Sequence, residues 1–185
     1  INRVTMTKFL NVFAAEGIIK QKNIGNLNLW LIEEGTENLK FPDDFFKVQE
    51  KYLEFLTHGS ESAIYNLIRN CISSDANVTK LMTEVIIPSI IQTDLLYNDG
   101  KIGKSEQQFL NGLISKSIQL INLGSFEQES KKNVIVLSSD SQNVLQAEAA
   151  SAIFRSDGWN VFSLGDMSSA IDVLFDLDLK KMLTK

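Results

Sequence analysis

Four consecutive stretches with helical periodicity, joined by short polar turns, constrain the fold more than any other feature of this chain. They cover residues 41–57, 60–73, 76–97 and 105–122. Within each stretch the apolar residues recur at spacings of three and four, which places them on one face of a helix. Short connections make successive helices antiparallel neighbours, so we predict a four-helix bundle over residues 36–130. Pro88 falls inside the third stretch, where we expect a kink.

A shorter unit precedes the bundle. Residues 2–16 form an amphipathic helical pattern, with Asn2 as N-cap and Gly17 as the residue that ends the helix. Two alternating stretches, 18–22 and 28–32, flank a turn with glycine and asparagine, which is typical of a β-hairpin. Helix, tight turn and hairpin over residues 1–35 match the C-terminal half of a winged helix. The polar stretch at residues 33–40 predicts the boundary between this unit and the bundle.

The hydrophobic period changes in the last third of the chain. The pattern predicts a strand at 133–137, a helix at 144–157, a strand at 159–164 and another helix from about Met167. This alternation predicts the start of a parallel, doubly wound sheet over residues 131–185. We expect this domain to be cut short, because a complete sheet of this kind needs more strands than the segment supplies. The expected fold class is therefore mainly α with α/β.

Composition excludes several classes of protein. Cys71 is the only cysteine, so no internal disulfide forms, and its apolar surroundings favour a buried thiol. No signal peptide is visible and no apolar run approaches the ~20 residues that span a bilayer, so we expect a cytoplasmic protein without membrane contact. With His58 as the only histidine, neither a catalytic triad nor a zinc site is supported. We expect no enzyme activity and no metal.

Charge is uneven along the chain. Residues 1–32 hold four basic residues and one acidic residue, a net charge of +3 in a chain of formal net charge −5. A basic end on an acidic body is compatible with nucleic-acid contact, although a solvated basic face is an equally simple explanation.

The N-terminal unit offers specific candidates for DNA contact. A recognition helix presents its first residues to base edges, and a hairpin suits phosphate or minor-groove contact. The candidates are Asn2, Arg3, Thr5, Met6 and Lys8 on the helix, and Lys20, Lys22, Asn23 and Asn26 on the hairpin. The sequences VTMTKFL at 4–10, EGII at 16–19 and IGN at 24–26 resemble the end of archaeal and bacterial winged-helix regulators. That resemblance implies binding to double-stranded DNA, with a structural or protein-contact wing as the alternative.

The rest of the chain resembles a second family. The sequences VIIPSI at 85–90, LYNDGKI at 96–102 and SEQQ at 105–108 resemble the helical cap of cobalamin-binding modules. GWNVFSLG at 158–165 is similar to the flavodoxin-like domain that follows this cap in the family. A DNA reader, a helical cap and a cobalamin-binding-like domain resemble the light-sensing repressor branch most.

The cobalt-ligating motif of that family is degenerate here. Its histidine corresponds to Gln142 and its glycine to Leu145, while the Glu-His pair of the cap corresponds to Gln107 and Gln108. His58 belongs to a different helix, and an amide is a poor cobalt ligand beside imidazole. The resemblance therefore leaves three alternatives: cobalamin without histidine ligation, another ligand, or none.

A candidate ligand set lies at the end of the first predicted strand of the α/β segment, where open sheets bind small molecules. Ser138, Ser139 and Asp140 lie there, followed by Gln142. Gln108 of the cap-like motif and Gly165 at the end of the second predicted strand complete the set. Helix capping is the simpler alternative to ligand binding for some residues in these segments. Ser105 and Gln108 fit a capping box, and Ser141 suits the N-cap of the next helix.

Together these patterns predict a DNA-binding transcriptional regulator with a C-terminal sensor or dimerisation module. The alternatives are a corrinoid-carrier or methyltransferase-type component, and a structural oligomerisation module without ligand. We also expect a homodimer, because two half-sites double the DNA contacts and the third and fourth helices carry more apolar residues than one core needs.

Overall fold

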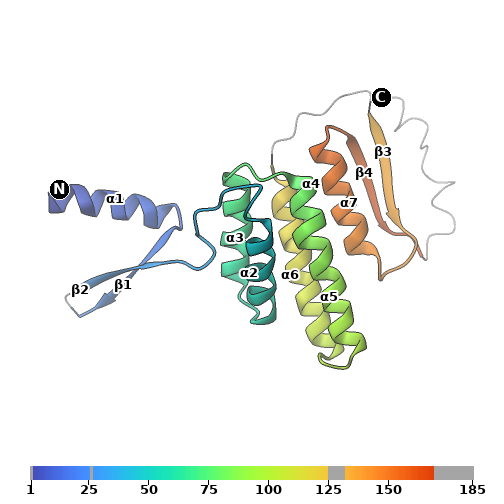
Figure 1. The fold of residues 1–185 in the computed structure, drawn as a ribbon, viewed down its shortest axis with the longest axis horizontal. Helices are drawn as coiled ribbons and strands as arrows, with labels where there is room; N and C mark the ends of the chain where they lie inside the picture. Colours follow the sequence, from blue (N-terminus) through green and yellow to red (C-terminus); the bar gives the residue numbers. More distant parts are fainter. Residues whose placement is uncertain (1, 26, 125–131, 169–185) are drawn as a thin grey trace.

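A computed structural model describes residues 2–25, 27–124 and 132–168. The described residues are mainly helical, with one antiparallel hairpin and one small parallel sheet, which confirms the predicted class of α with α/β. Figure 1 shows three parts in chain order: a projecting N-terminal unit, a helical bundle, and a helix with two strands on the far side of the bundle. Within the described residues, no helix combines the length and apolar character that crossing a membrane requires.

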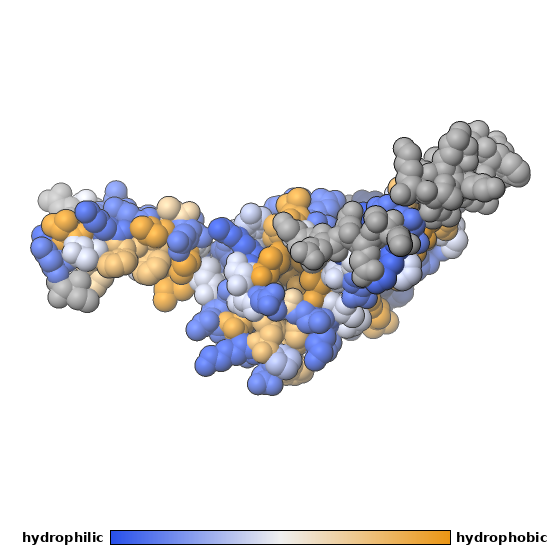
Figure 2. Space-filling model, turned by 90° about the horizontal axis from the view of Figure 1, so that it is seen from above, coloured by the Kyte–Doolittle hydropathy of each residue, from blue (hydrophilic) through white to orange (hydrophobic). Residues whose placement is uncertain are grey.

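The N-terminal unit consists of α1 (Arg3–Ala15), β1 (Ile19–Ile24) and β2 (Leu27–Ile32). The side chain of Asn2 caps α1 by accepting a hydrogen bond from the Val4 N–H at 3.2 Å. The strands pair antiparallel from Ile19 opposite Ile32 to Ile24 opposite Leu27. No residue of α1 is buried, so the unit has no core of its own among the described residues. Figure 2 shows hydrophobic surface along this projection.

The bundle contains six helical segments whose bounds follow the predicted pattern closely. They are α2 (Phe45–Thr57), α3 (Glu61–Ser73), α4 (Val78–Lys80), the π-helical segment η1 (Leu81–Ile86), α5 (Ile87–Asn98) and α6 (Lys104–Asn122). Their apolar faces form one continuous core, in which Val48, Leu67 and Ile114 are fully buried. The buried thiol expected at Cys71 is confirmed, and burial raises its pKa to about 12.

The irregularity expected at Pro88 lies just before it. Proline has no N–H to donate and its ring collides with the carbonyl four residues earlier in an α-helix. The backbone widens into η1 before the proline, and the N–H of Ile87 donates to the carbonyl of Met82, five residues back. Pro88 then occupies the first turn of α5, where its missing donor matters least.

The C-terminal part comprises β3 (Asn133–Ser138), α7 (Val144–Ser156) and β4 (Asn160–Asp166). β3 and β4 are parallel, and the register shifts between Val136 and Leu137. α7 packs against both strands and against α6, and its Ala149 and Ala152 join the buried cluster of the bundle. The helix predicted from about Met167 falls largely outside the described residues.

Candidate functional site

The basic residues predicted to contact DNA are exposed in the structure. Arg3 and Lys8 lie on α1, with Thr5 and Met6 between them, and all four are solvent-accessible. The N-terminus of α1 points away from the bundle (Figure 1), so these side chains are accessible to a large partner. Asn2 uses its side-chain oxygen to cap the helix, which leaves its amide nitrogen for other contacts.

The hairpin divides its candidates between two faces. Lys20 pairs with Leu31 and Lys22 with Leu29, so both lysines lie on one face of the hairpin. Asn23 lies on the other face, where its side chain accepts a hydrogen bond from Gln21 at 3.0 Å. Lys20 forms an exposed ion pair with Glu33 at 3.6 Å, whereas Lys22 has no carboxylate within 4 Å among the described residues. Asn26 lies outside the described residues.

Residues 33–40, predicted as a plain domain boundary, form a tightly held connection that we call the strap. Asn66 on α3 donates to the carbonyl of Glu34 at 3.2 Å, and Asn70 donates to the carbonyl of Glu37. Gly35 has a φ of +83°, and a Cβ there would collide with the Ala63 carbonyl and lie 2.8 Å from the Leu67 nitrogen. The strap is therefore held against the surface of α3.

The strap is also anchored by charge and by burial. Glu37 forms an ion pair with Lys51 of α2, and Leu39 is buried in the bundle core. Burial by itself raises the pKa of Glu37, but hydrogen bonding and attraction from Lys51 lower this pKa below its usual value overall. The carboxylate is thus held in its charged form at neutral pH.

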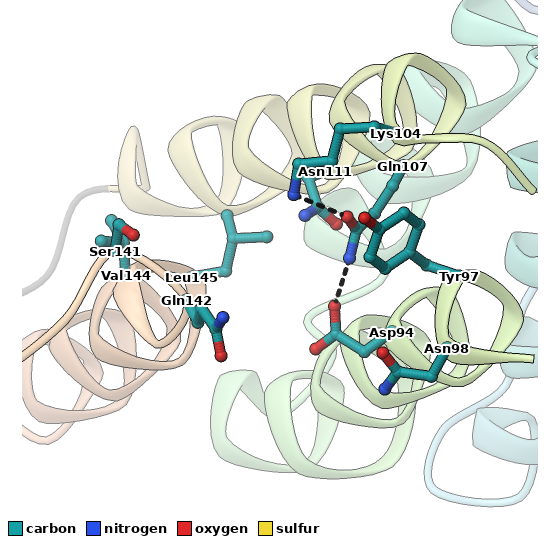
Figure 3. A pocket seen from close by; sticks show the side chains of 10 residues that line it. All are labelled: Asp94, Tyr97, Asn98, Lys104, Gln107, Asn111, Ser141, Gln142, Val144 and Leu145. Atoms are coloured by element: carbon teal, nitrogen blue, oxygen red, sulfur yellow. Dashed lines mark hydrogen bonds between the residues drawn. The ribbon is translucent and has the colours of Figure 1, made fainter.

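A polar pocket of about 410 Å³ lies where α5 and α6 meet the start of α7. Gln107, only 7% exposed, is its central side chain. Its amide nitrogen donates to Asp94 at 2.9 Å, and its amide oxygen accepts from the Lys104 ammonium at 3.0 Å. Figure 3 shows Lys104 and Asp94 approaching Gln107 from opposite sides. One primary amide therefore separates a positive and a negative charge on the same wall.

Further side chains complete the pocket. The Lys104 ammonium lies 5.0 Å from the centre of the Tyr97 ring, a cation–π contact that orients it. The Asn111 side-chain oxygen is fully buried and has no hydrogen-bond partner among the described residues. Ser141, Gln142, Val144 and Leu145 form the opposite wall at the start of α7 (Figure 3). The pocket is thus built by two parts of the chain that are distant in sequence.

The loop after β3 is organised by Asp140. Its Oδ1 accepts hydrogen bonds from the backbone N–H groups of Gln142 and Asn143, each at 2.9 Å. Bonds from the Asn143 side chain and backbone are the main reason that the pKa of Asp140 is lowered. Asp140, rather than Ser141, therefore takes the N–H groups that precede α7. Ser138 is buried and donates to the Asp140 carbonyl at 2.5 Å.

The candidate ligand residues are only partly brought together. Gln142 lines the pocket, whereas Ser138, Ser139, Asp140 and Gly165 do not. Gln108 is exposed and does not line the pocket either, so the side chain that faces α7 is Gln107. The predicted capping box of Ser105 and Gln108 is wrong: Gly103 is the N-cap, and its N–H donates to Glu106 at 2.8 Å.

Sequence reasoning missed most of the pocket residues. Lys104, Gln107 and Asn111 recur at spacings of three and four, so a helical wheel places them on one face of α6. Asp94, Tyr97 and Asn98 share a face of α5 by the same rule. The sequence therefore shows a polar face on each helix. Only the packing of α5 against α6 shows that the two faces form one pocket.

The residues of the pocket do not fit histidine-ligated cobalamin. Its donor groups are amides, a carboxylate, an ammonium and hydroxyls, and none is an imidazole or thiolate. His58 is the exposed C-cap of α2, where its Nδ1 lies 2.7 Å from the Glu54 carbonyl. Across the described ranges, no group of three or more His, Cys, Asp or Glu is placed to hold a metal ion.

Comparison with known proteins adds no family to these observations. No model of a known protein family matches the chain, and no curated protein matches it.

Proposed function

We propose that this chain is part of a DNA-binding transcriptional regulator, in which residues 1–32 contact duplex DNA and the rest acts as a sensor or dimerisation module. The observation that carries the proposal is the projecting unit of α1 and its hairpin, with a net charge of +3 in an otherwise acidic chain. Attraction between such a surface and phosphates is the sequence-independent part of DNA affinity.

The roles of the side chains follow from their positions. Arg3, in the first turn of α1, can form two parallel hydrogen bonds to a guanine edge in the major groove. Lys22 on β1 suits a phosphate, because an exposed ammonium on a hairpin contacts the backbone without reading sequence. Arg3 therefore contributes specificity, and Lys22 contributes affinity for any duplex.

A binding experiment separates these two roles. A duplex selected from a random library is titrated by fluorescence anisotropy with the wild-type protein, Arg3→Ala, Lys22→Ala and Lys101→Ala as an exposed control distant from the unit. Arg3→Ala should cost about 1–3 kcal/mol on the selected duplex only. Lys22→Ala should weaken all duplexes alike and reduce the salt slope by about 1, whereas Lys101→Ala should change neither. Unchanged affinity in the Arg3/Lys22 double variant would refute the proposal.

The proposed regulator is a homodimer, since a few phosphate contacts from one wing give weak binding at physiological salt. Most apolar residues of η1, α5 and α6 are wholly or partly buried in the bundle, but Ile91, Leu95 and Phe109 are exposed. These three are the candidates for contact with a second copy. Light scattering at tens of micromolar protein without DNA tests this, and a monomer mass would contradict it.

We further propose that the module does not hold cobalt through an imidazole of its own. Titration with hydroxocobalamin should give no spectral or magnetic-resonance signature of a histidine nitrogen on cobalt. Such a signature, lost in His58→Ala, would overturn this part of the proposal.

A further inference from the structure

The pocket between α5, α6 and α7 has a charge arrangement that points to its ligand. We propose that it binds a compact zwitterion of the size of a free amino acid, as the effector of the regulator proposed above, rather than a corrinoid. The effector role rests on the proposed function, whereas the binding itself does not.

The first argument is the paired charges. Lys104 and Asp94 lie on either side of the Gln107 amide, at 3.0 and 2.9 Å. No carboxylate lies within 4 Å of the Lys104 ammonium in the part of the chain that the structure describes. A molecule lying alongside Gln107 can place its carboxylate at Lys104 and its ammonium at Asp94. A ligand with only one charge satisfies only one of these two residues.

The second argument is the orphaned oxygen. Asn111 Oδ1 is buried without a hydrogen-bond donor in the part of the chain that the structure describes, which is unfavourable for a polar atom. Asn111 lines the pocket next to Lys104 and Gln107 (Figure 3). Rotation of the Asn111 side chain would let an ammonium or hydroxyl of a bound molecule supply the missing donor. Asn98 and Gln142 offer further polar contacts from α5 and from the start of α7.

The third argument is size and chemistry. The volume of about 410 Å³ lies in the lower part of the range for small-molecule sites. The lining has no imidazole or thiolate for cobalt, and charged and amide groups occupy much of it. A corrinoid is much larger than a compact zwitterion and does not fit within this volume.

The test measures binding without DNA, so that its failure is distinguishable from failure of DNA binding. Pools of the proteinogenic L-amino acids are screened by saturation-transfer NMR, and any hit is measured by calorimetry. Propionate and butylamine serve as analogues with one charge each, and hydroxocobalamin serves as the corrinoid. We expect at least one amino acid to bind, with each analogue at least about tenfold weaker.

Variants assign the binding to this pocket. Lys104→Met and Asp94→Asn should each weaken the hit by about tenfold or more. Lys101→Met and Asp99→Asn are the matched controls, because this exposed pair lies in the adjacent turn and does not line the pocket. Circular dichroism checks that each variant folds. The proposal is overturned by the absence of any hit at about 10 mM, by a hit that both pocket variants leave unchanged, or by hydroxocobalamin binding that these variants abolish.

Discussion

The bundle meets its two neighbours through junctions of opposite character. Towards the N-terminal unit, the strap is held by Asn66, Asn70 and the Glu37–Lys51 ion pair, and Gly35 lies directly on the α3 backbone. Towards α7, the interface contains the polar pocket, where the Asn111 side-chain oxygen is buried without a hydrogen-bond partner among the described residues. One oxygen of Glu37 at the strap is in the same state. The strap is therefore packed against backbone, whereas the α7 junction leaves room for a ligand.

The largest expected effect comes from Gly35→Ala. A Cβ there collides with backbone atoms of α3, and φ of +83° disfavours any side chain. We expect a loss of about 3 kcal/mol in the free energy of unfolding, measured by urea denaturation. Gly100→Ala is the control, since it has a similar φ of +68° with open space around it and should cost only about 1 kcal/mol. Equal losses at the two sites would show that the strap is not packed tightly on α3.

Asn70→Ala should have the next largest effect. It leaves the part-buried carbonyl of Glu37 without its donor, which costs about 1–2 kcal/mol. Gln92→Ala, an exposed change on α5, should be nearly neutral in the same denaturation experiment. The strap variant should also weaken DNA binding if the orientation of the N-terminal unit matters, whereas the Gln92 variant should not.

A pair of buried serines contrasts the bundle core with α7. Ser117 accepts from the buried Tyr52 hydroxyl at 2.9 Å, so Ser117→Ala should cost about 1 kcal/mol. Ser151 is equally buried, but its hydroxyl has no partner among the described residues, so Ser151→Ala should be neutral or slightly stabilising. Thermal unfolding of both variants measures these changes in stability. A destabilising Ser151→Ala would reveal a hydrogen-bond partner at that site.

The smallest effect is the pH dependence of the strap. The pKa of Glu37 is lowered in the folded protein, so its stabilising contribution is present above its unfolded value of about 4.3 and is lost as the pH falls. Glu37→Gln should therefore flatten the decline in stability between neutral pH and about pH 3, whereas Glu84→Gln on the exposed face of η1 should not. Parallel pH profiles for the wild-type protein and Glu37→Gln would contradict the assignment.

The sequence predicted the helices and strands well because each depends on local periodicity. Gly17, Gly59 and Gly158 follow helices with positive φ, as their positions in the pattern indicate. The strap was missed because polarity alone marks residues 33–40 as a boundary, and nothing local shows that Gly35 touches α3. Gln108 was a candidate because it stands at the histidine position of the cap motif, whereas the burial of Gln107 and its place in the pocket show that the neighbouring amide faces α7. The sequence therefore does not predict the features that depend on contacts between distant segments.

The widened turn of η1 has a consequence for Asp94, the pocket residue in the helix that follows. It acts as a one-residue insertion within a helix, so every side chain that follows is rotated by about 100° relative to an uninterrupted α-helix. Asp94 reaches Gln107 in this rotated frame. The same residues wound as a regular α-helix would turn the side chain at position 94 away from Gln107. The acidic end of the pocket thus depends on the wide turn before α5 as much as on the residue at position 94.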